Sequence, residues 1–86
     1  MQKIKLLNAP PCFASDDNLR EIFVGLIIDD VYKRSPKGTY KFRAFALFDA
    51  LMSKGEEGDK AILYINKHYG DNNYYLVRKN DAELIN

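Results

Sequence analysis

The chain has 86 residues, of which 47% are apolar and 29% are charged, a balance typical of globular proteins and unlike that of disordered ones. This length is above the roughly 40-residue limit below which disulfides or metals are usually needed, and it is too short for two ordinary domains. Thirteen lysines and arginines against twelve acidic residues give a net charge of +1, so no strong overall field attracts nucleic acid or anionic lipid. We expect one globular domain over residues 1–86, in which any electrostatic function is local.

Cysteine content and hydropathy predict the compartment. Cys12 is the only cysteine, which excludes an internal disulfide and the multi-cysteine zinc sites. The sequence contains neither a signal-peptide core nor an apolar run near the roughly twenty residues that cross a bilayer. We therefore expect a cytoplasmic protein that does not associate with membranes.

The first half of the chain is predicted to form a strand and then a helix. Residues 3–8 alternate apolar and basic side chains, which is typical of a short strand, and two prolines end it. Ser15 and Asp16 then suit the start of a helix, because a hydroxyl caps it and a carboxylate favours its positive end. The apolar residues of 19–31 recur with helical spacing, so we predict a helix up to residue 31.

The segment that follows has two interpretations. Residues 35–38 (Ser-Pro-Lys-Gly) are a turn signal. In the favoured interpretation a second helix covers residues 39–54 and ends at a glycine. In the alternative, residues 26–34 and 39–45 form a hairpin around the turn. A combination of the two has a strand up to residue 43 and a helix from Ala44.

The last third is predicted to be a hairpin. Residues 61–67 and 73–79 are rich in β-branched and aromatic side chains, and 69–72 suit a turn. Residues 80–84 are predicted to form a short terminal helix. The fold class is therefore α+β, in the order strand, helix, helix, strand, strand, short helix. The predicted core consists of Leu19, Ile22, Phe23, Leu26, Ile27, Phe45, Phe48, Leu51, Leu63, Ile65 and Leu76.

A basic and aromatic segment is the first candidate site. Residues 32–43 contain five positive charges and no acidic residue, interleaved with aromatic side chains. Cations hold phosphates and aromatic faces stack on bases, so this composition suits nucleic acid. The alternative is a solvated turn whose aromatic residues face the core. The nucleic-acid candidates are Lys33, Arg34, Lys37, Tyr40, Lys41 and Arg43.

The tyrosines and asparagines of the predicted final hairpin form the second candidate site. Tyrosine offers a large, rigid contact with a polar tip, which suits protein recognition. The alternative is that two of the tyrosines pack beneath the helices while the others cover the sheet. The partner-binding candidates are Tyr64, Tyr69, Asn72, Asn73, Tyr74 and Tyr75.

The sequence predicts no catalytic residue, no cofactor and no metal. His68 is the only histidine and Cys12 has no partner close in sequence, so neither forms a recognisable catalytic pair. Asp29 and Asp30 invite a magnesium site, but adjacent residues point in different directions and a third ligand would have to come from a distant acidic residue.

Three functions are consistent with these features. The leading hypothesis is a small non-enzymatic protein that binds a macromolecular protein partner, as an inhibitor or adaptor encoded by a phage or another mobile element. The second is a nucleic-acid-binding regulator that uses residues 32–43. The third follows from the order strand, helix, helix, strand, strand, which is similar to that of RelE-like toxins and implies a metal-free ribonuclease. The 13% aromatic content and an exposed hairpin edge also predict a homodimer.

Overall fold

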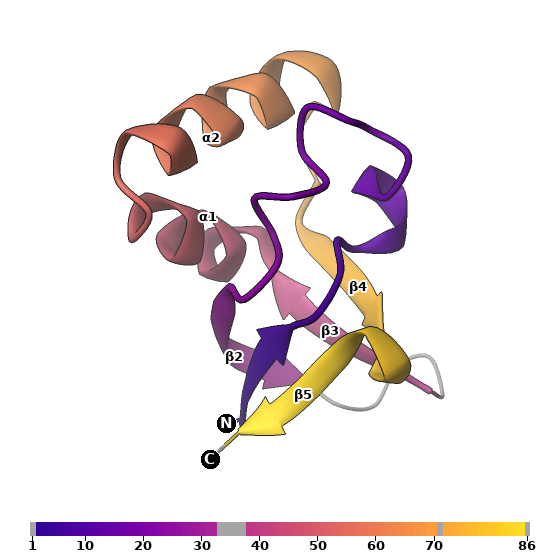
Figure 1. Cartoon of the computed structure of the whole chain (residues 1–86). Coiled ribbons are helices and arrows are strands. Elements are labelled where there is room, and N and C mark those ends of the chain that lie inside the picture. Colours follow the sequence, from indigo (N-terminus) through magenta and orange to yellow (C-terminus); the bar gives the residue numbers. More distant parts are fainter. Residues whose placement is uncertain (1, 33–37, 71, 86) are drawn as a thin grey trace.

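A computed structural model describes residues 2–32, 38–70 and 72–85 (Figure 1). It contains a five-stranded sheet of order β4-β3-β2-β1-β5, in which every neighbouring pair is antiparallel. The strands are β1 (Gln2–Leu6), β2 (Ile27–Tyr32), β3 (Thr39–Arg43), β4 (Tyr74–Arg78) and β5 (Ala82–Ile85). The helices are α1 (Ala44–Met52) and α2 (Glu56–His68), with 3-10 turns η1 (Pro11–Phe13) and η2 (Lys79–Asp81). The predicted α+β class is confirmed.

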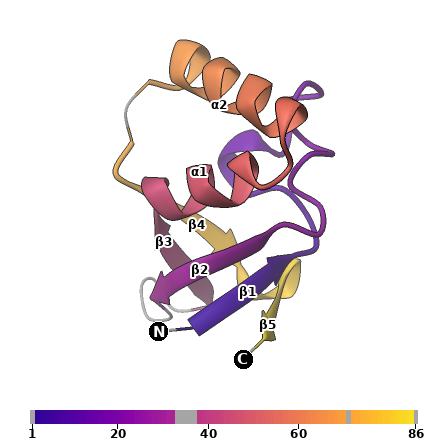
Figure 2. The same ribbon diagram turned by 90° about the vertical axis from the view of Figure 1, so that its left-hand side faces the viewer.

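Both helices lie on the same face of the sheet. α1 packs directly on β2 and β3, and α2 packs on α1 farther from the strands (Figure 2). Alternate strand residues such as Ile4, Phe42 and Val77 are fully buried beneath this layer, together with Leu47 of α1 and Ile65 of α2. The opposite face of the sheet is not covered by either helix. None of the helices in the described ranges is long and apolar enough to cross a bilayer.

A glycine allows the two helices to approach closely. Gly58 is buried in the first part of α2, and a Cβ atom at this position would overlap the backbone carbonyl of Leu51 in α1. Gly55, in the turn between the helices, has a φ of 72°, a conformation that side chains disfavour. The α1–α2 arrangement therefore depends on glycine at these two positions.

The combination of the two interpretations is confirmed, with a strand that ends at Arg43 and a helix that begins at Ala44. The hairpin alternative is right that β2 and β3 pair, but residues 44 and 45, which it placed in the strand, belong to α1. The favoured helix over residues 39–54 is wrong for residues 39–43, which form β3. Tyr40 and Phe42 are buried and alternate with Lys41 and Arg43 on the open face, so the two-residue period indicated the true structure. Of the predicted turn at residues 35–38 only Gly38 is described, because residues 33–37 lie outside the described part of the chain.

The predicted helix over residues 16–31 is wrong. Residues 14–25 form a series of turns, in which the Leu19 N–H donates to the Asp16 carbonyl and the Ile22 N–H to the Leu19 carbonyl. Gly25 has a φ of 84°, which ends this segment before β2 begins at Ile27. The apolar residues with helical spacing therefore belong to two different elements: Leu19 and Phe23 are buried in these turns, and Ile28 and Val31 are on the buried face of β2. We call residues 14–25 the turn segment.

The predicted strand over residues 61–67 is also wrong, because these residues belong to α2. Gly58, Ala61 and Ile65 are buried at helical spacing, whereas Leu63 is 70% exposed. The strand predicted at 73–79 exists as β4, but it pairs with β3. The terminal helix predicted over residues 80–84 is limited to η2, because the residues from Ala82 onward pair with β1 as β5.

The predicted core is partly correct. The buried members are Leu19, Phe23, Leu26, Leu51 and Ile65; Ile22 and Phe48 are partly buried; and Ile27, Phe45, Leu63 and Leu76 are exposed. Phe13, which is fully buried, was not among the predicted core residues. Its ring centre lies 5.1 Å from that of Phe23, 4.8 Å from that of Tyr69 and 5.3 Å from that of Tyr75. Phe13 therefore connects η1 to the turn segment, to the end of α2 and to β4.

Candidate functional site

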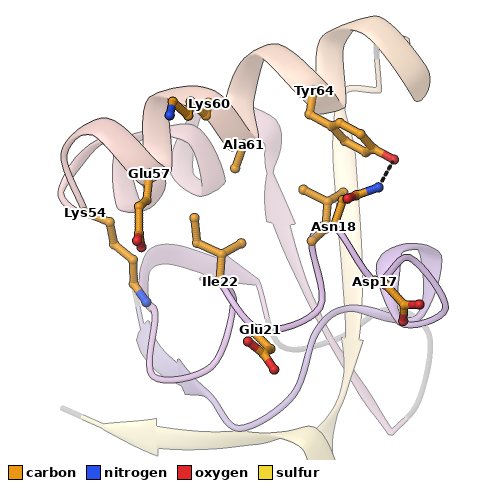
Figure 3. Close-up of a pocket in the computed structure, with 10 residues that line it drawn as sticks. Asp17, Asn18, Glu21, Ile22, Lys54, Glu57, Lys60, Ala61 and Tyr64 are labelled. Atoms are coloured by element: carbon orange, nitrogen blue, oxygen red, sulfur yellow. Dashed lines mark hydrogen bonds between the residues drawn. The ribbon is translucent and has the colours of Figure 1, made fainter.

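Two of the candidate tyrosines bind an aspartate of the turn segment. The Tyr69 hydroxyl donates a hydrogen bond of 2.8 Å to Asp16 Oδ2, and the Tyr64 hydroxyl donates one of 3.0 Å to the same atom. The Asn18 side chain donates to the Tyr64 oxygen at 3.0 Å (Figure 3). We call these four residues the Asp16 network. It attaches the turn segment to α2, so these tyrosines have a structural role.

The hydrogen bonds of the Asp16 network shift two pKa values in opposite directions. The bond from Tyr69, with smaller contributions from Asn18 and Tyr64, lowers the pKa of the Asp16 carboxyl below its ordinary value. The same bond raises the pKa of Tyr69 to about 12. Near neutral pH Asp16 is therefore an ionised carboxylate and Tyr69 a neutral phenol.

The other tyrosine and asparagine candidates lie on different surfaces. Tyr75 faces the core between Phe13 and Phe42, and burial raises the pKa of its hydroxyl. Tyr74 is the neighbour of Tyr75 in β4, so its side chain points to the opposite face of the sheet, where it is exposed. Asn72 and Asn73, just before the strand, are also exposed. The structure therefore does not bring the six predicted partner-binding residues into one continuous surface.

A cleft of about 510 Å³ separates the turn segment from α2 (Figure 3). Leu19, Ile22 and Ala61 supply its apolar part, and Asn18 and Tyr64 close one end. Lys54, whose ammonium lies 3.5 Å from the Val24 carbonyl, stands at the other end. The remaining charged lining consists of Asp17, Glu21, Glu57 and Lys60. This mixture of signs does not select one class of ligand.

Cations and aromatic rings gather instead on the uncovered face of β3 and β4. The strand register places Lys41 opposite Leu76 and Arg43 opposite Tyr74. The Lys41 Nζ lies 4.1 Å from the centre of the Tyr74 ring. Tyr74 is 46% exposed and Leu76 39% exposed, and Arg78 continues the row. We call Lys41, Arg43, Tyr74, Leu76 and Arg78 the β3–β4 face.

A hollow of about 400 Å³ lies at one end of the β3–β4 face. It is lined by Arg43, Ala44, Phe45, Asn73 and Tyr74. Phe45 is 51% exposed, and the Arg43 guanidinium lies 5.9 Å from the centre of its ring. The Ala44 N–H donates to the Asn73 carbonyl at 2.9 Å, which fixes the start of α1 to the residue that precedes β4. Two exposed rings, a guanidinium and an amide therefore border one opening, the Phe45–Tyr74 hollow.

The structure brings together only part of the predicted nucleic-acid set. Lys41 and Arg43 share the open face. Tyr40 alternates with them in β3, so its side chain points to the other face and is buried. The Lys79 Nζ lies 5.7 Å from the centre of the Tyr40 ring. Lys33, Arg34 and Lys37 lie outside the described residues. Arg78, Leu76 and Phe45 were not predicted to lie beside the basic segment. The alternation of residues 74, 76 and 78 along β4 was the signal that could have shown that Tyr74, Leu76 and Arg78 share one face of the sheet.

Charge is unevenly distributed between the layers of the molecule. The helices, the turn between them and the turn segment carry Asp16, Asp17, Glu21, Asp49, Glu56, Glu57 and Asp59 against Arg20, Lys54, Lys60 and Lys67. The described strands and η2 carry Lys3, Lys5, Lys41, Arg43, Arg78 and Lys79 against Asp29, Asp30, Asp81 and Glu83. Excess acid therefore lies on the helical side and excess base on the sheet side.

Cations on the β1 half of the open face have acidic neighbours. Lys3 forms an ion pair of 3.7 Å with Asp29, and Lys5 pairs in register with Glu83. No acidic residue belongs to β3 or β4. The positive charge of the open face is therefore concentrated on the β3–β4 half.

The other residues considered for chemistry do not form a site. Asp29, Asp30 and Asp49 line one hollow of about 290 Å³, but no three acidic, histidine or cysteine side chains in the described ranges are placed to hold a metal ion. His68 is exposed and its ring packs 4.3 Å from that of Tyr64. Cys12 is exposed as a whole residue, but its thiol is partly buried, and this burial raises the pKa of the thiol.

Comparison with known proteins gives no relative for this chain. No protein-family model matches it, and neither a curated protein nor a solved structure does so. The resemblance to RelE-like toxins therefore rests only on the order of elements predicted from the sequence. Function has to be argued from the surfaces described above.

Proposed function

We propose that the protein binds single-stranded nucleic acid on the β3–β4 face, with one nucleobase held in the Phe45–Tyr74 hollow. The observation that carries this proposal is the position of two exposed aromatic rings that border one hollow, Tyr74 beside Lys41 on the open face of the sheet and Phe45 beside Arg43 at the start of α1. Base stacking on such rings contributes about 1–3 kcal/mol per base, and it requires bases that are not already stacked in a duplex. The arrangement therefore suits a single strand.

Each side chain has a defined part in this proposal. Lys41, Arg43 and Arg78 contact phosphates along the strand direction, while Tyr74 and Phe45 offer ring faces to bases. The amide of Asn73 and the guanidinium of Arg43 border the hollow and can donate hydrogen bonds to the edge of a base. Stacking tolerates any base, so the sequence preference should be weak unless these donors select one.

The charge distribution supports the proposal despite a net charge of only +1. The acidic helices lie on the opposite side of the sheet from the β3–β4 face (Figure 2). Exposed charges farther apart than about 8–10 Å are largely screened at physiological salt, so a polyanion near the sheet responds mainly to the local cations. The resulting field also orients the molecule with the sheet toward its ligand.

Charge reversal tests the phosphate contacts. Fluorescence anisotropy of a labelled single-stranded oligonucleotide should show binding that weakens steeply with salt, by roughly 0.7 power of salt concentration per phosphate contact. The double variant Lys41→Glu with Arg78→Glu should abolish binding. Lys60→Glu with Lys67→Glu makes the same change of charge on α2 and should leave most of the affinity. Equal losses in the two double variants, or no binding by the parent at low salt, would refute the proposal.

A second set of variants tests the stacking. Tyr74→Ala should weaken binding about 5-fold to 150-fold, corresponding to the loss of one stacked base, whereas Tyr74→Phe should bind nearly as the parent does. Duplex DNA should compete poorly. Circular dichroism establishes that the variants are folded, which is expected because Tyr74 is exposed.

Binding of a protein partner is the second candidate function. It was predicted from a tyrosine and asparagine surface whose residues the structure distributes over different sides of the molecule. Purification of the tagged protein from its native host separates the two candidates, because bound nucleic acid is detected by absorbance and bound protein by mass spectrometry. A stoichiometric protein partner without nucleic acid would reverse their order.

A further inference from the structure

The outer edge of β4 presents backbone groups that point away from the sheet, in a register fixed by the pairing of β4 with β3. The Ala44 N–H donates to the Asn73 carbonyl at one end of the strand, and the Lys79 N–H donates to the Gly38 carbonyl at the other. Hydrogen-bonded pairs alternate in an antiparallel ladder, so Tyr75 and Val77 direct their N–H and carbonyl groups toward β3. The same groups of Tyr74, Leu76 and Arg78 point away from the sheet.

This edge lacks two of the features with which proteins usually prevent strand addition, a proline and a β-bulge. β4 is the last strand of the sheet on this side, it contains no proline, and its register with β3 is uninterrupted by a bulge. The described backbone makes no hydrogen bond to the outer groups of Leu76. A hollow of about 410 Å³, lined in part by Pro11, Cys12 and Val77, lies along the strand. The edge is therefore able to pair with another strand.

We propose that β4 of a second copy of this chain adds antiparallel at this edge, with Leu76 facing the second copy's Leu76. The outward-pointing residues then pair in register, and Tyr74 faces Arg78 of the second copy. A cation beside this ring repeats the kind of contact that Lys41 already makes with it. The sequence of the strand is therefore self-complementary about Leu76, which is why a second copy is the occupant we infer.

The dimer would extend the site described above, and this consequence rests on the proposed function. The two β3–β4 faces would form one continuous surface, because the side chains of Tyr74, Leu76 and Arg78 remain on the open side of both sheets. Arg78 of the second copy would add a cation next to each Tyr74. A longer single strand would then span both copies.

Reciprocal charge variants test the pairing at Leu76. Sedimentation equilibrium without nucleic acid should show the parent as a dimer at high micromolar concentration. Leu76→Lys and Leu76→Glu should each be monomeric, because like charges would then face each other across the two-fold axis. An equimolar mixture of the two variants should recover the dimer mass, because the opposite charges then meet. This recovery distinguishes a direct contact from a loss of folding.

An exposed leucine on the opposite edge of the sheet provides the control. Leu84 of β5 is 42% exposed, close to the 39% of Leu76, and Leu84→Lys should remain dimeric. A monomeric parent, or a dimer that Leu84→Lys breaks and Leu76→Lys does not, would overturn the proposal. A monomeric parent that still binds the oligonucleotide would overturn the dimer and leave the proposed function standing, whereas a dimeric parent that binds no oligonucleotide would do the reverse, so the two proposals fail separately.

Discussion

Tyr69 donates a hydrogen bond of 2.8 Å to Asp16, a residue 53 positions earlier in the sequence. The bond connects the end of α2 to the turn segment, which contains neither a regular helix nor a strand. It holds in place a segment that includes the buried Leu19 and Phe23. The protonation of these two groups should therefore affect the stability of the whole fold.

Stability should depend on Tyr69 at alkaline pH and on Asp16 at acid pH. The pKa of Tyr69 is raised from 10.0 to about 12 in the folded protein, so its contribution is present below pH 10 and is lost as the pH rises toward 12. The pKa of Asp16 is lowered from 3.8, so its contribution is present above that value and is lost as the pH falls through the folded-state pKa. Urea unfolding at a series of pH values measures both the acid and the alkaline loss of stability.

The variant Tyr69→Phe separates this bond from other pH effects. It should lower the melting temperature by several degrees near neutral pH and reduce the loss of stability between pH 10 and 12. Tyr74→Phe removes a phenol that makes no bond to Asp16 and should change neither. If Tyr69→Phe and the parent lost the same amount of stability between pH 10 and 12, the hydrogen bond would contribute nothing to stability.

Phe13 should be among the side chains most important for stability, although it follows directly after prolines and a cysteine. Its ring contacts those of Phe23, Tyr69 and Tyr75, and Phe13→Ala should cost about 3–5 kcal/mol. A chain of this length has a total stability of roughly 4–13 kcal/mol, so the variant should be close to unfolding. Phe45→Ala, at an exposed ring, should change the free energy of unfolding by about 0.5 kcal/mol or less. Similar values for the two variants would contradict the described packing.

Gly58→Ala should destabilise the protein even though alanine favours helices. The added methyl group would overlap the Leu51 carbonyl, so the two helices would have to separate, at a cost of about 1–3 kcal/mol. Lys60→Ala, two residues later in the same helix and exposed, provides the control for helix propensity. Thermal unfolding measures both, and a Gly58→Ala variant as stable as the parent would exclude the close α1–α2 contact.

Cys12 should react slowly with alkylating reagents. Burial of the thiol raises its pKa above the ordinary value of 9.0, so the thiolate fraction near pH 7 is smaller than that of a free thiol. Iodoacetamide labelling followed by mass spectrometry should be slower for the folded protein than for the same chain in urea. Equal rates in the two states would show that η1 does not shield the sulfur.

Local patterns predicted the strands at 3–8 and 73–79, for which no helix was considered as an alternative. At 39–43 the alternation of β3 competed with the favoured helix over 39–54, and the strand that breaks at Ala44 was only among the alternatives considered. Residues 61–67 could not be assigned in this way, because their β-branched and aromatic side chains favour a strand locally. What makes them helical is the packing of α2 on α1, which depends on contacts between Gly58 and a residue of another element.

The candidate site was half predictable for a similar reason. The cations at 41 and 43 were evident in the sequence, and Tyr74 was a candidate for a different, protein-binding site. Nothing local indicates that β3 pairs with β4, because the two helices separate them in the chain. Only the pairing places Tyr74 beside Arg43 and makes one surface from what the sequence presents as two separate candidates.

The first and last strands lie side by side, with Lys3 paired to Ile85, so the two ends of the described chain lie close together at one edge of the sheet (Figure 1). A pulling force applied between these ends would act across the β1–β5 ladder and open its hydrogen bonds one after another, like a zipper, instead of loading them all together in shear. β5 would peel away first. The protein should therefore yield to low forces along this direction, however well its core is packed.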